Sequence, residues 1–145
     1  MPIHRVVVER IDAGSSIPLP ERATDGSACF DLRAAARTTL ESGRVELVPT
    51  GLRMTCPPGT FIEVRPRSGL SAKGVVMVNA PGTVDRDYSG EVRVPMTFLF
   101  TGRYVIEAGD RIAQIRVVED HAAEFVGGTV AASPSRQGGF GSTGR

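Results

Sequence analysis

Segment 79–92 contains the densest set of residues that could do chemistry: Asn-Ala-Pro-Gly-Thr-Val-Asp-Arg-Asp-Tyr-Ser-Gly-Glu-Val. Asp85 and Asp87 alternate with an arginine, so on an extended backbone both carboxylates would face one side. Close acids can leave one carboxylate ionised as a base, or can hold a cation and its waters. The alternative is a polar β-hairpin tip, because Asp, Ser and Gly favour turns. Asn79, six residues before the first Asp, favours a functional site.

Two other segments place a polar side chain inside an apolar run. Asp31 lies in segment 26–34 between strand-like neighbours, and an acid there needs a partner. The simple alternatives are an ion pair with Arg33 or a charge on an outward rim. Gln114 lies in an apolar strand that follows a Gly-Asp turn, and a buried amide also needs partners. A cross-strand hydrogen bond is the simple alternative for this amide.

Arg67, Ser68 and Gly69 follow a predicted strand and precede a short turn. In that position they can direct backbone N–H groups, a hydroxyl and a guanidinium at one anion. An ordinary capped turn is the alternative reading.

The last ten residues, 136–145, hold four glycines and no aliphatic side chain. Such a segment is typical of a disordered tail, because it cannot bury enough apolar surface to offset the entropy of ordering. It would also suit a flap over a phosphorylated ligand. Arg136 would add charge, Phe140 a stacking face, Ser142 and Thr143 donors, and the glycines, Gly141 among them, close backbone approach.

Short β-branched runs separated by Gly and Pro predict the elements that must position these residues. They favour an all-β sandwich, jelly roll or barrel. One helical turn is predicted at 68–73, and 131–137 reads as a hinge into the tail. The predicted strands are 5–10, 29–33, 45–48, 52–55, 61–64, 75–78, 92–100, 104–106 and 112–118.

Length and composition narrow the function. The 145 residues predict one domain, and a net charge of +1 argues against nucleic acid or membranes as the main partner. Two cysteines without metal-type spacing and two histidines make a zinc site a poor explanation. Buried free thiols fit a reducing compartment. No long apolar stretch follows the N-terminus, so we expect a cytoplasmic protein.

In their order along the chain, the four segments and the glycine-rich end resemble the five motifs of the trimeric dUTPases (dUTP pyrophosphatases). The resemblance implies a jelly-roll β-barrel over residues 1–130 and a flexible arm over 131–145. It also implies a homotrimer in which the arm of one subunit closes a neighbour's active site. The activity implied is Mg²⁺-dependent hydrolysis of dUTP to dUMP and pyrophosphate, which removes dUTP from the nucleotide pool and supplies dUMP for thymidylate synthesis.

The resemblance also implies roles for single residues. Asp85 would be the general base that activates the water attacking the α-phosphorus. Asn79 would read uracil, and Tyr88 would pack against the deoxyribose and exclude a 2′-hydroxyl. Gly82 and the backbone around Thr83, Val84 and Arg93 would complete the base pocket.

The remaining implied roles concern the phosphates and the metal. Arg67, Ser68 and Gly69 would cradle the phosphates, while Asp31 and Gln114 would hold waters on a Mg²⁺ bound mainly by substrate phosphates. In the arm, Phe140 would stack on uracil beside Gly141, and Arg136, Ser142 and Thr143 would reach the γ-phosphate.

One feature departs from the family pattern. The family arm commonly places its arginine five residues before the Phe, whereas Arg136 is four residues before Phe140. Two other readings stay open: a dCTP deaminase, which shares the fold but needs an added Glu near the base, and a non-catalytic nucleotide-binding module. The intact Asp85–Tyr88 segment favours the hydrolase over both.

Overall fold

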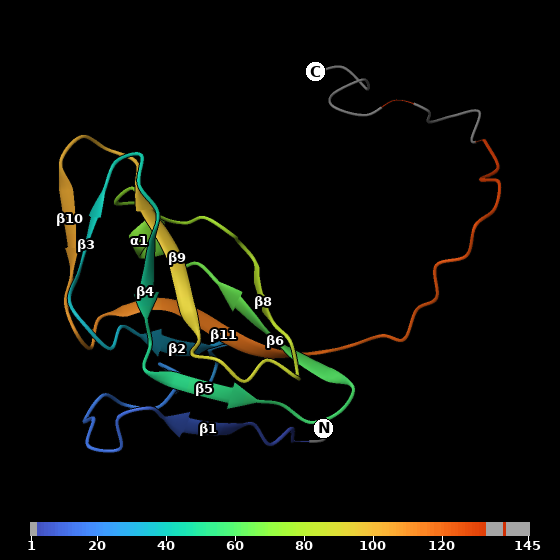
Figure 1. Cartoon of the computed structure of the whole chain (residues 1–145), viewed down its shortest axis with the longest axis horizontal. Coiled ribbons are helices and arrows are strands. Elements are labelled where there is room, and N and C mark those ends of the chain that lie inside the picture. Colours follow the sequence, from blue (N-terminus) through green and yellow to red (C-terminus); the bar gives the residue numbers. More distant parts are fainter. Residues whose placement is uncertain (1–2, 133–137, 139–145) are drawn as a thin grey trace.

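The computed structural model describes residues 3–132 and residue 138, and these residues form an almost purely β domain (Figure 1). The only helix in this part of the chain is one short turn, α1, which lies inside the predicted 68–73. The elements are β1 (Val7–Arg10), β2 (Phe30–Arg33), β3 (Thr38–Glu41), β4 (Glu46–Pro49), β5 (Leu52–Thr55), β6 (Thr60–Arg65), α1 (Ser68–Ser71), β7 (Val75–Met77), β8 (Gly82–Val84), β9 (Arg93–Phe98), β10 (Arg103–Ile106) and β11 (Arg111–Glu119).

The strands pair into four antiparallel sheets, with the orders β2-β11-β6-β8, β4-β9-β7, β1-β5 and β10-β3. The all-β prediction is therefore confirmed. The predicted closed barrel is not seen in the backbone pairing of the described residues, where no sheet closes on itself. Most strands span only three or four residues, too few for a continuous ladder around a barrel. Between β3 and β9 only an isolated bridge, Ser42 to Phe98, makes the connection.

One face of the four-stranded sheet is buried in the core, and the other face carries polar side chains. Asp31 of β2 is paired with Gln114 of β11, which is also paired with Arg65 of β6. Directly opposite residues share a face, so these three polar side chains form one row across the sheet. The adjacent residues Leu32 and Val64 face the other way and are buried in the core.

Most predicted strands are confirmed to within a few residues at their ends, and two short strands were missed. β3 contains two threonines and one buried leucine, Leu40, and has no apolar run to reveal it. β8 lies in segment 79–92, where glycine and proline suggested a loop; pairing with β6 makes it a strand. The predicted free thiols are confirmed, with Cys56 buried and Cys29 half-buried.

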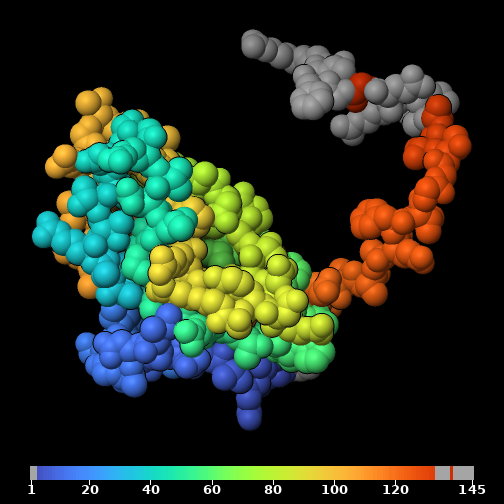
Figure 2. Space-filling model, viewed as in Figure 1, coloured from blue at the N-terminus to red at the C-terminus, as the bar shows by residue number. Residues whose placement is uncertain are grey.

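After β11 the chain leaves the domain body and runs as an irregular segment over residues 120–132 (Figures 1 and 2). Two of its apolar side chains lie outside the core that the described residues form: Phe125 is 99% exposed and Val130 is 92% exposed. Within the described residues, no helix is long and apolar enough to cross a membrane.

Candidate active site

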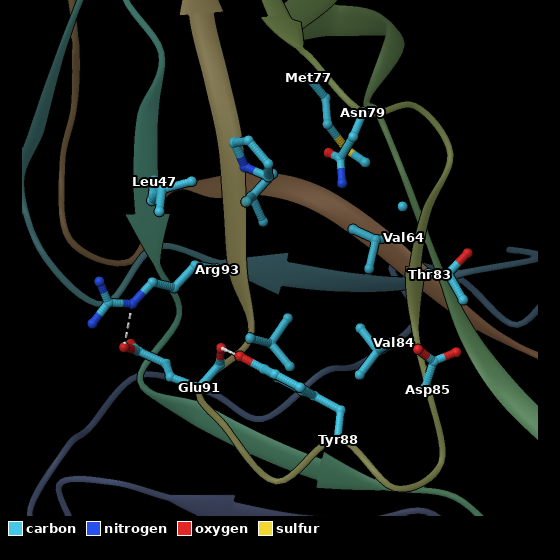
Figure 3. Close-up of a pocket in the computed structure, with 14 residues that line it drawn as sticks. Leu47, Val64, Met77, Asn79, Thr83, Val84, Asp85, Tyr88, Glu91 and Arg93 are labelled. Carbon is cyan, nitrogen blue, oxygen red and sulfur yellow. Dashed lines mark hydrogen bonds and ion pairs between the residues drawn. The ribbon is translucent and has the colours of Figure 1, made fainter.

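A cavity of about 500 Å³, here called the first cavity, opens between β8, β9 and the loop that joins them (Figure 3). All seven site residues predicted between positions 79 and 93 line it. The lining residues are Leu47, Val64, Met77, Asn79, Gly82, Thr83, Val84, Asp85, Tyr88, Glu91, Val92, Arg93, Val94 and Pro95. An apolar wall with a few polar groups is typical of a site for a small organic ligand.

Gly82 leaves room for the Asn79 side chain. A Cβ at position 82 would lie 3.2 Å from Asn79 Nδ2 and 3.3 Å from the methyl carbon of Met77. The glycine is buried and belongs to β8, so its backbone position is fixed by pairing with Val64. The Asn79 amide, one donor group and one acceptor, therefore lies at the cavity with space to meet a flat ring edge.

Asp85 directly follows β8 and begins a turn. The Tyr88 N–H donates to the Asp85 carbonyl at 3.1 Å, so the chain reverses here instead of continuing extended. Figure 3 shows the Asp85 carboxylate without a hydrogen bond or ion pair to the other lining residues. It is thus available to accept a proton from a bound water.

The expectation that Asp85 and Asp87 face the same side is wrong, because it assumed an extended backbone. The turn directs Asp87 into a different cavity, on the far side of Tyr88. The hairpin-tip alternative is also wrong: β8 pairs with β6, whereas β9 pairs with β4 and β7.

A second cavity, of about 420 Å³, holds the other predicted residues. It lies against the polar row of the four-stranded sheet and the N-terminal residues of α1. Asp31, Arg67, Ser68, Gly69 and Gln114, all predicted, line it together with Ala23, Ser27, Ala28, Cys29, Arg65 and Arg111.

Asp31 has the partner that its place in a strand required, but not the expected one. Its side chain is only 12% exposed, with one oxygen 3.2 Å from Arg111 Nη1 and the other 3.6 Å from Arg67 Nε. Arg33 instead pairs with Glu21 and donates to the Gly109 carbonyl. Asp31 therefore holds Arg67 in the second cavity.

Gln114 is held by one end of its amide. Its Nε2 donates to the Pro66 carbonyl at 2.9 Å, just beyond the end of β6. This leaves the Gln114 carbonyl oxygen to accept from another donor. Within residues 3–132, no group of three or more His, Cys, Asp or Glu side chains is placed to hold a metal directly.

The two cavities are separate within one chain. They share no lining residue, and the successive β6 residues Val64 and Arg65 line different cavities. Successive side chains of a strand point to opposite faces of its sheet, so Val64 and Arg65 face apart. The residues predicted for one site are thus divided between two cavities of the chain.

Sequence reasoning missed several lining residues. Glu91 follows Gly90 in segment 79–92, and Arg111 lies three residues before Gln114, so both lay within segments already singled out. Their roles depend on partners distant in the chain: Glu91 accepts from the Gly51 backbone, and Arg111 pairs with Asp31. Five predicted residues, Arg136, Phe140, Gly141, Ser142 and Thr143, lie outside the described residues.

The sequence model of the dUTPase family matches residues 15–144. The chain belongs to the dUTPase family. It is 47% identical over 148 residues to a deoxyuridine 5′-triphosphate nucleotidohydrolase of Anaeromyxobacter sp., with 100% of both chains covered. It is 43% identical over 142 residues to the enzyme of that name from Solibacter usitatus, with 97% of both covered.

A solved dUTPase fold matches the described architecture. The crystal structure of the dUTPase from Streptococcus mutans superposes with a TM-score of 0.77 at 30% identity, covering 81% of this chain and 98% of the other. The predicted family is confirmed, and with it membership of an enzyme family named for nucleotide hydrolysis. All the residues that line the first cavity fall within residues 15–144, the range that the family model matches.

Proposed function

We propose that this chain is a dUTP diphosphatase that hydrolyses dUTP to dUMP and pyrophosphate. The observation that carries the proposal is the first cavity, where an amide, a carboxylate and an aromatic ring come together at Asn79, Asp85 and Tyr88. Family membership identifies the substrate class, and this cavity supplies one group each for base, water and sugar.

The chemical step places Asp85 as the general base. Its carboxylate takes a proton from a water, the water oxygen forms a bond to the α-phosphorus, and the bond from that phosphorus to the bridging oxygen breaks. Pyrophosphate leaves with the electron pair, and the proton remains on Asp85 until solvent removes it. The Asp85 carboxylate has no hydrogen bond or ion pair to the other residues that line the first cavity. This supports its role, because a general base must reach its water.

Asn79 is proposed to read the base. Its amide can donate to a uracil oxygen and accept from the ring N–H, whereas cytosine presents the reversed pattern and would leave buried groups unpaired. The backbone of Gly82, Thr83, Val84 and Arg93 completes the pocket, and Tyr88 packs against the deoxyribose. The contact between Gly82 and Asn79 supports the assignment, since it places the amide at the cavity.

The second cavity is proposed to receive the phosphates. Arg67, held by Asp31 at 3.6 Å, offers a fixed guanidinium, while Ser68 and Gly69 offer a hydroxyl and backbone N–H groups. Mg²⁺ bound to the phosphates would neutralise charge that develops on them.

The residues of this cavity fit a hydrated Mg²⁺. The free Gln114 carbonyl oxygen and the remaining lone pairs of Asp31 can accept from waters on the ion. Mg²⁺ usually keeps several waters when it binds substrate phosphates, so a site without a cage of protein ligands suits it.

A complete site is proposed to combine cavities from two copies of the chain, since the two cavities of one chain share no lining residue. We therefore propose a homotrimer with shared sites, in which residues 1–130 form the jelly-roll-type all-β domain. The arm, residues 131–145, is proposed to close a neighbour's site, with Phe140 and Gly141 at the base and Arg136, Ser142 and Thr143 at the γ-phosphate. The segment 120–132, which is exposed with respect to the other described residues, supports this exchange. The cytoplasmic location stays a prediction, as does the absence of nucleic-acid and membrane partners.

The position of attack can be tested with ¹⁸O-labelled water. We expect one ¹⁸O atom in the phosphate of dUMP and none in pyrophosphate, because the water attacks the α-phosphorus. Mass spectrometry of both products gives the result, and dUMP incubated with the enzyme in labelled water controls for exchange. Label in pyrophosphate would place the attack at the β-phosphorus and contradict the step. Ammonia release from dCTP would instead favour the deaminase.

A further inference from the structure

Two residues that follow Tyr88 in the chain hold its ring. The Tyr88 hydroxyl donates to the Glu91 carbonyl at 2.9 Å (Figure 3). A Cβ at Gly90 would lie 2.5 Å from the Tyr88 hydroxyl oxygen and 2.7 Å from the ring carbon that bears it. The Gly90 backbone is not left-handed, so space for the ring explains this glycine, not a special conformation.

The carbonyl that accepts from Tyr88 is itself fixed. The Glu91 carboxylate, only 16% exposed, accepts from the Gly51 N–H at 3.0 Å and from Arg93 Nε at 2.7 Å. The next residue, Val92, donates its N–H to the Leu52 carbonyl at 2.8 Å. These bonds join the end of the loop to the start of β5, so the acceptor for Tyr88 cannot move freely.

Side-chain packing alone does not fix the Tyr88 ring. Tyr88 is 46% exposed and lines the first cavity on one side. It also lines another cavity, of about 230 Å³, beside Glu9, Arg53 and Asp87. With space on both sides, the ring depends on the Gly90 gap and the Glu91 carbonyl for its position.

We propose that Gly90 and Glu91 are positioning residues for sugar discrimination, which hold Tyr88 where the first cavity accepts deoxyribose and rejects ribose. The inference rests on the proposed function, in which Tyr88 packs against the sugar. Gly90 sets how close the ring lies to the loop, and Glu91 sets the position of its hydroxyl. Neither residue touches the reacting atoms.

Gly90→Ala tests the inference, because the new methyl group must displace the ring. We expect the ratio of kcat/KM for dUTP to that for UTP to fall about tenfold or more, within the range by which pocket shape discriminates. The ratio for dUTP over dCTP should stay as in the wild type, because Asn79 reads the base. A general loss of stability would not move one ratio and spare the other. Gly26→Ala is the matched control, since a Cβ there meets nothing within 4 Å, and both ratios should stay unchanged.

Tyr88→Phe provides a second variant that keeps the ring and removes only the bond to Glu91. We expect the same ratio to fall by a smaller factor. The inference would be overturned if the wild-type enzyme discriminates dUTP from UTP and both variants keep the wild-type ratio of kcat/KM for the two substrates. A Gly90→Ala enzyme that loses dUTP and UTP activity equally would overturn it too. A wild-type enzyme inactive on dUTP would instead overturn the proposed function, so the two failures are distinguishable.

Discussion

Asp85→Asn should abolish turnover of dUTP while leaving nucleotide binding intact. The amide keeps the size of the side chain but cannot take a proton from water, so we expect kcat to fall about 10²- to 10⁴-fold, the usual contribution of a positioned base. Since the carboxylate has no ion pair or hydrogen bond to the other cavity residues, the change should not disturb the fold. Steady-state pyrophosphate release measures kcat, and titration with a non-hydrolysable dUTP analogue measures binding.

Asp87→Asn is the matched control, because it makes the same chemical change two residues away. Its carboxylate lies in the cavity on the far side of Tyr88, away from the first cavity. We expect nearly wild-type kcat. Equal losses in the two variants would indicate a general effect of charge in this loop, and a fully active Asp85→Asn enzyme would place the base elsewhere.

Mixing two inactive variants should restore activity if each site combines cavities from two chains. Asp85→Asn disables the first cavity and Arg67→Gln disables the second, so each homotrimer should be nearly inactive. When equal amounts are co-expressed and the trimers that contain both chains are isolated, one of the three sites in each mixed trimer has both halves intact. We therefore expect about a third of wild-type turnover, measured as pyrophosphate release per chain.

The control for this experiment pairs the Asp85→Asn chain with a chain that carries both substitutions. No site then has Asp85, and activity should stay at the level of the single variant. If both halves of a site came from one chain, the first mixture would also stay inactive, because every site would carry one substitution. That result would contradict the shared site.

The sequence predicted which residues line the cavities better than it predicted how they face each other. The pattern of segment 79–92 identified Asn79 and Asp85, the family resemblance added Tyr88, and all three line one cavity. It failed for Asp87, because alternation of side chains holds only on an extended backbone and a turn begins at Asp85. A hydrogen bond between residues three apart was thus enough to separate the two acids.

Contacts between residues far apart in the chain were the second feature that the sequence could not predict. Asp31 needed a cation, and Arg33, two residues away, was the nearest candidate that follows it in sequence, but the fold brings Arg67 and Arg111 to it instead. The separation of the two cavities could not be derived from the sequence, since it depends on Val64 and Arg65 facing opposite sides of one sheet. The short strands β3 and β8 were missed for a similar reason, because cross-strand pairing defines them more than composition does.

The proposed hydrolysis of dUTP is tested most directly by pyrophosphate release from dUTP, dCTP, dTTP and UTP, measured with the whole chain and Mg²⁺. We expect rapid release from dUTP and a much lower kcat/KM for the other three, with Asn79 as the proposed group that rejects cytosine and Tyr88 as the one that rejects ribose. Equal turnover of dUTP and dCTP, or no release from dUTP, would contradict it.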